Sequence, residues 1–239
     1  MSYNTPFTKD NLNSHLKELA KEFRKRNGTS MPAEIILIGG AAILANYGFR
    51  EMTYDIDAII FASSAMKEAI NHVGDKLNLP NGWLNTDFVK TKSYSSKISE
   101  VSVYYKTFYN VLTVRTIAAE YLIAMKLMSG RQYKNDLSDI VAILWEHKRL
   151  GMPITKDTVI NALNFLYGED TELPAVIEQF IEDIFKIGNY EKIYNEIRES
   201  EKHSREILLD FDRDYPNVLK ESNTDEIIKR AKNNKSERS

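Results

Sequence analysis

The chain has 239 residues, of which 43% are hydrophobic and 28% charged, and its formal net charge is -2. This composition is typical of an ordinary soluble globular protein, and the length suffices for one large domain or two modest ones. The small net charge gives no global sign of polyanion binding, so any nucleic-acid partner must meet a local basic patch. The sequence has no cysteine, which excludes disulfides, thiolate metal sites and a cysteine nucleophile.

Targeting and cofactor motifs are also missing from the sequence. No apolar run reaches membrane-spanning length, and the N-terminus lacks the apolar core of a signal peptide. We therefore predict a cytoplasmic protein with no membrane partner. Neither Gly-x-x-x-x-Gly-Lys-Ser/Thr nor Gly-x-Gly-x-x-Gly occurs, which argues against a P-loop enzyme and a Rossmann dehydrogenase.

The first predicted element is a helix over residues 8–26. Its apolar residues recur at helical spacing, and Asn27-Gly28 is a stop signal. Basic residues gather at its end, namely Lys21, Arg24, Lys25 and Arg26. We interpret them as a solvated face that complements the helix dipole, with an RNA contact as the alternative.

A glycine pair follows the predicted apolar strand at residues 35–38. Gly39 and Gly40 precede a short predicted helix over residues 41–47, which Gly48 closes. Because glycine has no side chain, backbone amides can approach an anion there, and the helix N-terminus adds a favourable dipole. A triphosphate would suit this place. The alternative is that the glycines only form a strand-to-helix turn.

The next predicted strand carries Asp55 and Asp57. Side chains alternate along a strand, so these two carboxylates point to one side while Ile56, Ala58 and Ile60 point to the other. Two like charges this close favour a cation between them, and Mg²⁺ commonly binds one or two carboxylates together with substrate phosphates. The alternative is a polar edge strand without a ligand.

The middle of the chain is predicted to continue with a helix opened by Ser64, a loop at residues 78–82, and antiparallel strands at 101–106 and 111–115. Thr116 can cap the next helix, which Gly130 ends. Lys126 lies in an otherwise apolar part of that helix, so taken alone it favours a side chain that reaches outward to solvent. Asp136 is a natural N-cap for the following helix, and Asp139 then falls at N3.

These patterns together resemble the nucleotidyltransferase superfamily, which has the polymerase-beta-like fold. The strand, the Gly-Gly pair, the short helix and Arg50-x-x-Thr53-x-Asp55-x-Asp57 carry the resemblance. More narrowly, the chain resembles the AbiEii-type branch and its uncharacterised relatives, which include bacterial toxins that modify tRNA. Residues 121–131 and 134–140 match that branch's helical lysine motif and its Asp-x-x-Asp motif. Four motifs in order over residues 37–140 are harder to obtain by chance than one.

The resemblance implies a site and a reaction. A nucleoside triphosphate would be the substrate, with Mg²⁺ or Mn²⁺ as the cofactor on Asp55 and Asp57. The triphosphate would be held by the glycine pair and its neighbours, which are Gly39, Gly40, Arg50 and Thr53. The resemblance also implies that Lys126 lies at the nucleotide site.

The Asp-x-x-Asp motif supplies the remaining roles that the resemblance implies. Asp139 would act as a base for the incoming hydroxyl or as a partner that orients Lys126, while Asp136 is assigned to the helix cap. Arg131 and Lys134 would hold phosphates or RNA. The resemblance to the toxin branch suggests the end of a tRNA as the acceptor, while other superfamily members modify a protein hydroxyl or a small molecule such as an aminoglycoside. The partner of such a toxin in a toxin-antitoxin or phage-defence system would be an antitoxin protein.

The third metal-binding acid of the wider superfamily has no clean counterpart. Members often place it on a later strand, but this region has no hydrophobic-Asp-hydrophobic match, and Asp87 and Glu100 are the nearest candidates. The alternative function is therefore a catalytically weak module that binds nucleotide or a protein partner for regulation. A purely structural helical adaptor is a third hypothesis, which requires all four motifs to be coincidental.

Beyond Leu150 the pattern is helical throughout. Helices are predicted from Thr155 or Asp157 to Tyr167, from Pro174 to residue 187, and over residues 190–212. The middle of the last helix, residues 198–206, is so polar that it should face solvent or a partner.

We predict an α/β (α+β) fold, with a nucleotidyltransferase-like mixed sheet, flanking helices and a helical C-terminal region. The predicted domains are residues 1–115, a helical domain at 116–220 that completes the active site, and a flexible tail at 221–239.

Overall fold

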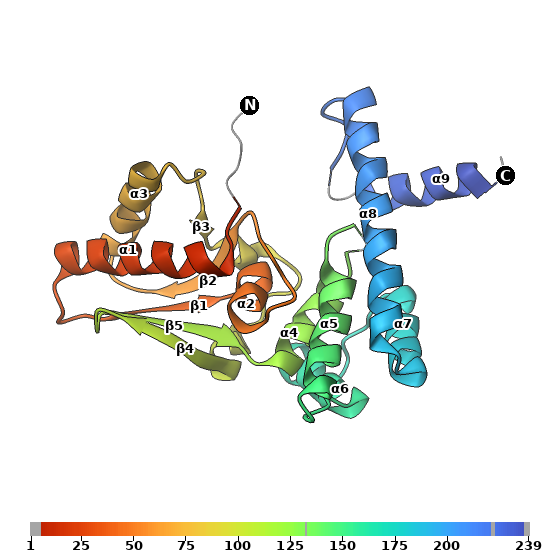
Figure 1. Cartoon of the computed structure of the whole chain (residues 1–239), viewed down its shortest axis with the longest axis horizontal. Coiled ribbons are helices and arrows are strands. Elements are labelled where there is room, and N and C mark those ends of the chain that lie inside the picture. The colour runs from red at the N-terminus through yellow and green to blue at the C-terminus, as the bar shows by residue number, and fades with distance from the viewer. Residues whose placement is uncertain (1–5, 132, 221–222, 237–239) are drawn as a thin grey trace. The chain divides into compact units, whose positions relative to one another are not determined.

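The computed structural model describes residues 6–131, 133–220 and 223–236. It confirms the predicted class, with a five-stranded mixed sheet, flanking helices and a helical C-terminal region (Figure 1). The chain divides into two compact units, Met1–Met128 with Asp157–Glu172, and Ser129–Lys156 with Leu173–Ser239. In the described part of the chain, no helix is long and apolar enough to cross a membrane.

The first unit contains the sheet. Its strands are β1 (Ala33–Leu37), β2 (Ile56–Phe61), β3 (Leu84–Asn85), β4 (Ser102–Phe108) and β5 (Leu112–Ile117). They lie in the order β3-β2-β1-β5-β4, and β1 pairs antiparallel with β2 and parallel with β5. β2 and β3 are parallel, whereas β4 and β5 form the predicted antiparallel pair.

Helices α1 (Lys9–Asn27) and α3 (Ala65–Leu77) lie side by side in this unit (Figure 1). The predicted apolar positions of α1 are fully buried, namely Leu12, Leu16, Leu19 and Phe23. Thr8 caps α1 in a capping box with Asn11, which satisfies amides that the helix leaves unpaired. Burial of one such apolar face gives α1 its place on the core.

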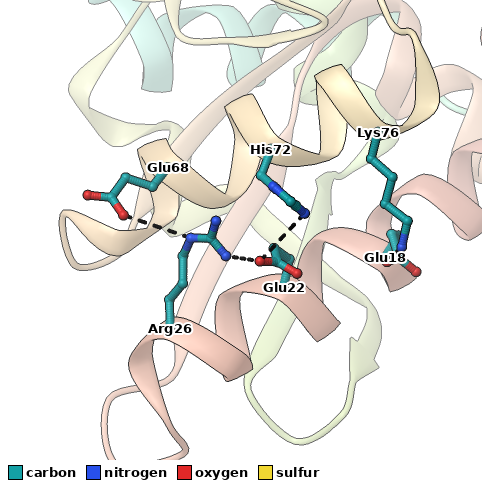
Figure 2. A network of polar contacts seen from close by, with 6 residues as sticks. All are labelled: Glu18, Glu22, Arg26, Glu68, His72 and Lys76. Carbon is teal, nitrogen blue, oxygen red and sulfur yellow. Dashed lines mark hydrogen bonds and ion pairs between the residues drawn. The ribbon is translucent and has the colours of Figure 1, made fainter.

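A line of charged side chains joins α1 to α3 (Figure 2). Glu22 is buried and pairs with Arg26, and its Oε1 lies 3.8 Å from Nε2 of His72. Arg26 also lies 3.8 Å from Glu68. Farther along, Nζ of Lys76 donates to Oε1 of Glu18 at 2.5 Å. In this arrangement Arg26 and His72 belong to the contact between two helices.

Three helices complete the first unit, namely α2 (Gly39–Asn46), α4 (Ala119–Ser129, up to Met128) and most of α6 (Lys156–Tyr167). The short helices η1 (Asp87–Lys90) and η2 (Ser96–Val101) lie between β3 and β4. α6 is distant in sequence but is tied to the loop at residues 93–97. Ser95 donates to Leu166 O at 2.6 Å, and Tyr167 donates to Ser93 O at 2.6 Å.

Thr116 does not cap α4, contrary to prediction. It lies inside β5, where it pairs with Val103 of β4, and it is almost fully buried. The ladder pairing extends β5 to Ile117, so α4 begins only at Ala119. Gly130 follows the end of α4 with a positive φ of 59°, as expected for a glycine stop.

The second unit is helical and comprises α5 (Asp136–Arg149), α7 (Ala175–Ile187), α8 (Tyr190–Asp214) and α9 (Thr224–Ser236). Trp145 of α5 lies against Tyr194 of α8 with ring centroids 6.1 Å apart. Lys148 donates to Gly188 O at 3.0 Å, where α7 ends. These contacts fasten α5 to the turn between α7 and α8.

The predicted flexible tail is in part a helix. α9 packs on α8, and its Thr224 and Ile228 are buried. The segment is rich in charge, but a few apolar and small residues on one side suffice for packing when a neighbouring helix is present. Residues 221–222 and 237–239 of the predicted tail lie outside the described residues.

Candidate functional site

Asp55 and Asp57 flank the first residue of β2. β2 begins at Ile56, so Asp55 precedes the strand and is exposed, which corrects the prediction that both acids lie in it. The ladder starts at Ile56 because its amide donates to Trp83 O at 3.1 Å beside β3. Asp57 is half-buried between Ile56 and Ala58, which are fully buried. The alternation predicted for the strand is therefore confirmed for Ile56, Asp57 and Ala58, whereas Ile59 and Ile60 are both half-buried.

The glycine pair forms the first turn of α2. The helix begins at Gly39 and not at Ala41 as predicted, and Gly39 has a positive φ of 53° that L side chains adopt only with strain. The Ile38 amide donates to Asp57 O at 2.9 Å, which joins the end of β1 to β2. A Cβ at Gly39 would lie 4.0 Å from Oδ2 of Asp57. The carboxylate of Asp57 is therefore beside the start of α2.

Gly40 is the closest approach of this turn to the loop before β2. A Cβ there would lie 2.7 Å from Oγ1 of Thr53 and 2.9 Å from Nη2 of Arg50. Real Cβ atoms do not show such distances, so a side chain at position 40 would have to displace Thr53 or Arg50. A guanidinium and a hydroxyl thus lie directly at the N-terminus of an eight-residue helix, where the dipole favours anions.

The loop that carries Arg50 and Thr53 is held in place by the N-terminal segment. Phe7 exchanges two backbone hydrogen bonds with Thr53, of 2.7 and 2.9 Å, and Phe7 is almost fully buried. Oγ1 of Thr53 donates to Oδ1 of Asp55 at 3.3 Å, and Nε of Arg50 donates to Met52 O at 3.1 Å. These hydrogen bonds therefore fix the positions of the polar side chains in the loop.

Six predicted residues are thus brought together in the first unit. We call them the glycine-aspartate cluster; they are Gly39, Gly40, Arg50, Thr53, Asp55 and Asp57. The cluster combines two carboxylates with a cation, a hydroxyl and a helix N-terminus. This set of groups can hold a phosphate and a divalent cation together.

Asp55 and Asp57, the two acids of the cluster, suit a cation that takes its remaining oxygen ligands from water or from a bound phosphate. Within residues 6–131, 133–220 and 223–236, no group of three or more His, Cys, Asp and Glu residues could hold a metal ion. Mg²⁺ does not need such a group, because it commonly binds one or two carboxylates and takes its other oxygens from water and phosphates. Over Gly39, Oδ2 of Asp57 is the nearest atom to the position of a Cβ, at 4.0 Å, so this carboxylate borders space that no closer protein side chain fills.

The strand next to Asp57 carries an amide side chain at the position that faces it. Asn85 of β3 is the register partner of Asp57, and its side chain bonds to Gly82 O and to the Asp87 amide. Asp87 is exposed and pairs with Lys90 at 2.7 Å, while Glu100 is exposed in η2. By strand register, the candidate for a third polar side chain beside Asp57 is therefore Asn85. The sequence did not reveal it because β3 has only two residues.

Lys126 lies in α4, in the first unit. Its exposed fraction is 7%, so it does not extend freely into solvent as the interpretation from its apolar neighbours suggests. Its neighbours in α4, including Ala124, Met125 and Leu127, are also buried. A lysine this deeply buried requires polar surroundings to keep its charge.

The Asp-x-x-Asp motif lies at the start of α5 in the second unit, and the helix begins at Asp136, one residue earlier than predicted. Asn135 is the N-cap residue, so Asp136 is the first helical residue rather than the cap, and Asp139 lies one position beyond N3. The Asp139 amide accordingly donates to Asn135 O at 2.9 Å, as the first bond within the helix. Both acids are buried, with exposed fractions of 3% and 4%.

Asp136 is held by the loop before α5. Its Oδ2 accepts hydrogen bonds from Oγ of Ser129 and Nε of Arg131, both at 2.9 Å. Arg131, predicted to bind phosphate, therefore already has a protein carboxylate as a partner. Lys134 is exposed.

Sequence reasoning also missed a buried acid on α8. Glu201 is 1% exposed and accepts hydrogen bonds from Ser138 of α5, at 3.1 Å from the amide and 2.6 Å from Oγ. Burial raises the pKa of Glu201 to about 7; the hydrogen bonds from Ser138 act in the opposite direction, and the charge of Asp139 raises it further. A helical periodicity in α8 could have identified it, because Ile193, Ile197 and Leu208 lie on the same stripe.

Comparison with known proteins adds one finding. A family model described as a nucleotidyltransferase of unknown function (DUF6036) matches residues 14–198. The chain has no significant match among curated proteins or among solved structures.

Proposed function

The chain belongs to this family of nucleotidyltransferases, and we propose that it moves a nucleoside monophosphate from a nucleoside triphosphate to an acceptor hydroxyl. The glycine-aspartate cluster carries the proposal. It combines, within one small region, a glycine turn that admits an anion and two carboxylates that suit a divalent cation.

The phosphates would lie at the first turn of α2. Gly39 and Gly40 have no side chains to cover the backbone amides there, and Arg50 adds a positive charge beside Gly40. The hydroxyl of Thr53 orders the loop through its bond to Asp55. These groups would bind the triphosphate and orient its α-phosphate.

Asp55 and Asp57 would hold Mg²⁺ or Mn²⁺. When bound, such an ion offsets negative charge on the phosphates and on the departing pyrophosphate. Asp57 is fixed by β2, while Asp55 is fixed by its hydrogen bond from Thr53. The two acids therefore differ in exposure but are both held by the protein.

The transfer itself forms one bond and breaks one. The acceptor oxygen attacks the α-phosphorus, the bond from that phosphorus to the oxygen bridging to the β-phosphate breaks, and pyrophosphate leaves. We assign Asp139 as the group that takes the acceptor proton or orients the hydroxyl, and Lys126 as the group that stabilises charge on the phosphates. Both assignments rest on the lysine and Asp-x-x-Asp motifs.

The finer proposal is that the acceptor is the end of a tRNA and that the protein acts as a toxin restrained by an antitoxin protein. Its support is the resemblance to the AbiEii-type branch. Exposed basic side chains near the start of α5, on Lys134, Arg198 and Arg205, would suit a polyanionic acceptor in a chain whose net charge is -2. The alternative, a regulatory module that binds nucleotide without turnover, follows from the absence of a three-acid group in the described residues.

The decisive experiment is transfer of label from each of the four α-phosphate-labelled nucleoside triphosphates, with Mg²⁺, to total tRNA and to a protein extract. Wild type is compared with Asp57→Asn. Label that moves only with wild type establishes the transferase, and the labelled fraction identifies the acceptor class. Nucleotide that binds with Mg²⁺ while no label moves would instead establish the regulatory module.

A further inference from the structure

Three side chains of α8 hold the N-terminus of α5. Arg198 and Arg205 both donate to Oδ1 of Asn135, at 2.9 and 3.0 Å, while Glu201 accepts from Ser138. The three residues recur at intervals of three and four, so they lie on one face of α8. The N-cap and the third residue of α5 are therefore both bound by the same helix.

Glu201 supplies what the start of α5 lacks. The first amides of a helix have no acceptor within the helix, and the Ser138 amide is one of them. The Asn135 side chain makes no capping bond to α5, because its oxygen accepts from the two arginines. The carboxylate of Glu201 accepts hydrogen bonds from both the amide and the hydroxyl of Ser138, so two bonds fix the position of Ser138.

The residue fixed in this way is the direct neighbour of Asp139. We infer that Glu201 is a positioning residue for Asp139, which it orients by holding Ser138 in the first turn of α5. The inference rests on the proposed function in that Asp139 acts there on the acceptor hydroxyl. Glu201 lies beyond residues 14–198, the range that the family model matches.

A capping residue alone would not need to be a buried acid. An amide side chain could accept from the Ser138 amide and donate to its hydroxyl oxygen equally well. The acid instead places a second titratable carboxyl close to Asp139, with Arg198 as the neighbouring cation. The charge on Glu201 thus acts on Asp139 in addition to the hydrogen bonds that hold the backbone.

This distinction defines the test. Glu201→Gln preserves the shape and both hydrogen bonds to Ser138 but removes the charge, whereas Glu199→Gln makes the same change at an exposed position two residues away on α8. Ser138→Ala is a second variant, which removes the hydroxyl bond and keeps the acid. All are made in the full-length chain, and circular dichroism confirms folding.

The first readout does not depend on catalysis. The carboxyl carbon of Asp139 is followed by NMR from about pH 5.5 to 8.5 and assigned with Asp139→Asn. We expect its signal to change near pH 7 as Glu201 ionises, and this step to be absent in Glu201→Gln but retained in Glu199→Gln. The same curve in wild type and Glu201→Gln would overturn the inference.

The second readout is transfer of labelled nucleotide at saturating substrate. We expect kcat of Glu201→Gln to fall about tenfold or more, with KM within about twofold, and Ser138→Ala to change in the same direction. Wild-type kcat and an unchanged pH profile in Glu201→Gln would show that Glu201 is only a cap. Loss of the NMR step together with a wild type that transfers nothing would reject the proposed function while leaving Glu201 as the group that sets the surroundings of Asp139.

Discussion

Gly40 and Thr53 are packed so closely that a Cβ at position 40 would lie 2.7 Å from Oγ1 of Thr53. Nη2 of Arg50 lies almost as near, at 2.9 Å. The first turn of α2 and the loop before β2 therefore meet so closely that a side chain on residue 40 fits only if Thr53 or Arg50 shifts. This contact is what joins the glycine pair to the Asp-x-Asp segment.

We predict that Gly40→Ala weakens binding of the Mg-nucleotide about tenfold or more. The added methyl group must displace the hydroxyl of Thr53 or the guanidinium of Arg50, both of which are proposed to order or bind the phosphates. Gly48→Ala is the matched control, because nothing lies within 4 Å of a Cβ there. Calorimetric titration of each variant with Mg-nucleotide measures the effect. Equal affinities for wild type and Gly40→Ala would show that the phosphates do not bind at this turn.

A second prediction concerns Asp57. Asp57→Asn removes a negative charge from a half-buried ligand beside Gly39, so binding of the cation and transfer of nucleotide should fall together, with transfer reduced about 100-fold or more. Mn²⁺ binding by electron paramagnetic resonance and label transfer are the two measurements. Glu51→Gln, an exposed acid in the same loop, should leave both unchanged. Mn²⁺ binding that survives Asp57→Asn would assign the cation to other residues.

Local sequence patterns correctly predicted the helices whose buried face is marked by regularly spaced apolar residues. The apolar spacing of α1 and α3 predicted both helices, and Gly130 and Gly188 end helices with positive φ as glycine stops should. The glycine pair and the two aspartates were also found from their residue types. Their mutual contact was not, because it depends on the approach of Gly40 to Thr53 across the intervening helix and loop.

The errors arose where tertiary pairing overrides a local signal. Thr116 is a good capping residue by type, but its ladder partner Val103 keeps it in β5. Asp136 is a good N-cap by type, yet it is bound by Ser129 and Arg131 while Asn135 takes the cap position. Glu201 lies in a stretch that is polar enough to predict exposure, and its partner Ser138, which satisfies the buried carboxylate, is 63 residues away.

A third prediction separates charge from packing at Lys126. Lys126→Met keeps most of the side-chain volume and removes the charge from a site that is 7% exposed. We expect kcat to fall about 100-fold if the ammonium stabilises the phosphates, and the melting temperature, measured in parallel, shows how much of the change comes from stability. Lys202→Met, at an exposed position of α8, is the control. An unchanged kcat in Lys126→Met would show that Lys126 has only a structural role.

The last prediction is a dependence of stability on pH that originates at Glu201. Its pKa is raised to about 7 in the folded chain from an ordinary value of 4.5, chiefly by burial. Between these values the folded state binds more protons than the unfolded state, so stability falls as pH rises from about 4.5 to about 7 and is then constant. The contribution is on the order of 3 kcal/mol.

Urea unfolding of wild type and Glu201→Gln, followed by circular dichroism between about pH 5 and 8, isolates this contribution, since the other titrating groups are common to both chains. The glutamine does not ionise, so the stability of Glu201→Gln relative to wild type should increase with pH up to about 7 and then level off. Glu199→Gln should show no such trend, because Glu199 is exposed. A stability difference between Glu201→Gln and wild type that stays constant over this range would mean that Glu201 is ionised in the folded protein throughout. Its hydrogen bonds from Ser138 would then outweigh the cost of burying the charge.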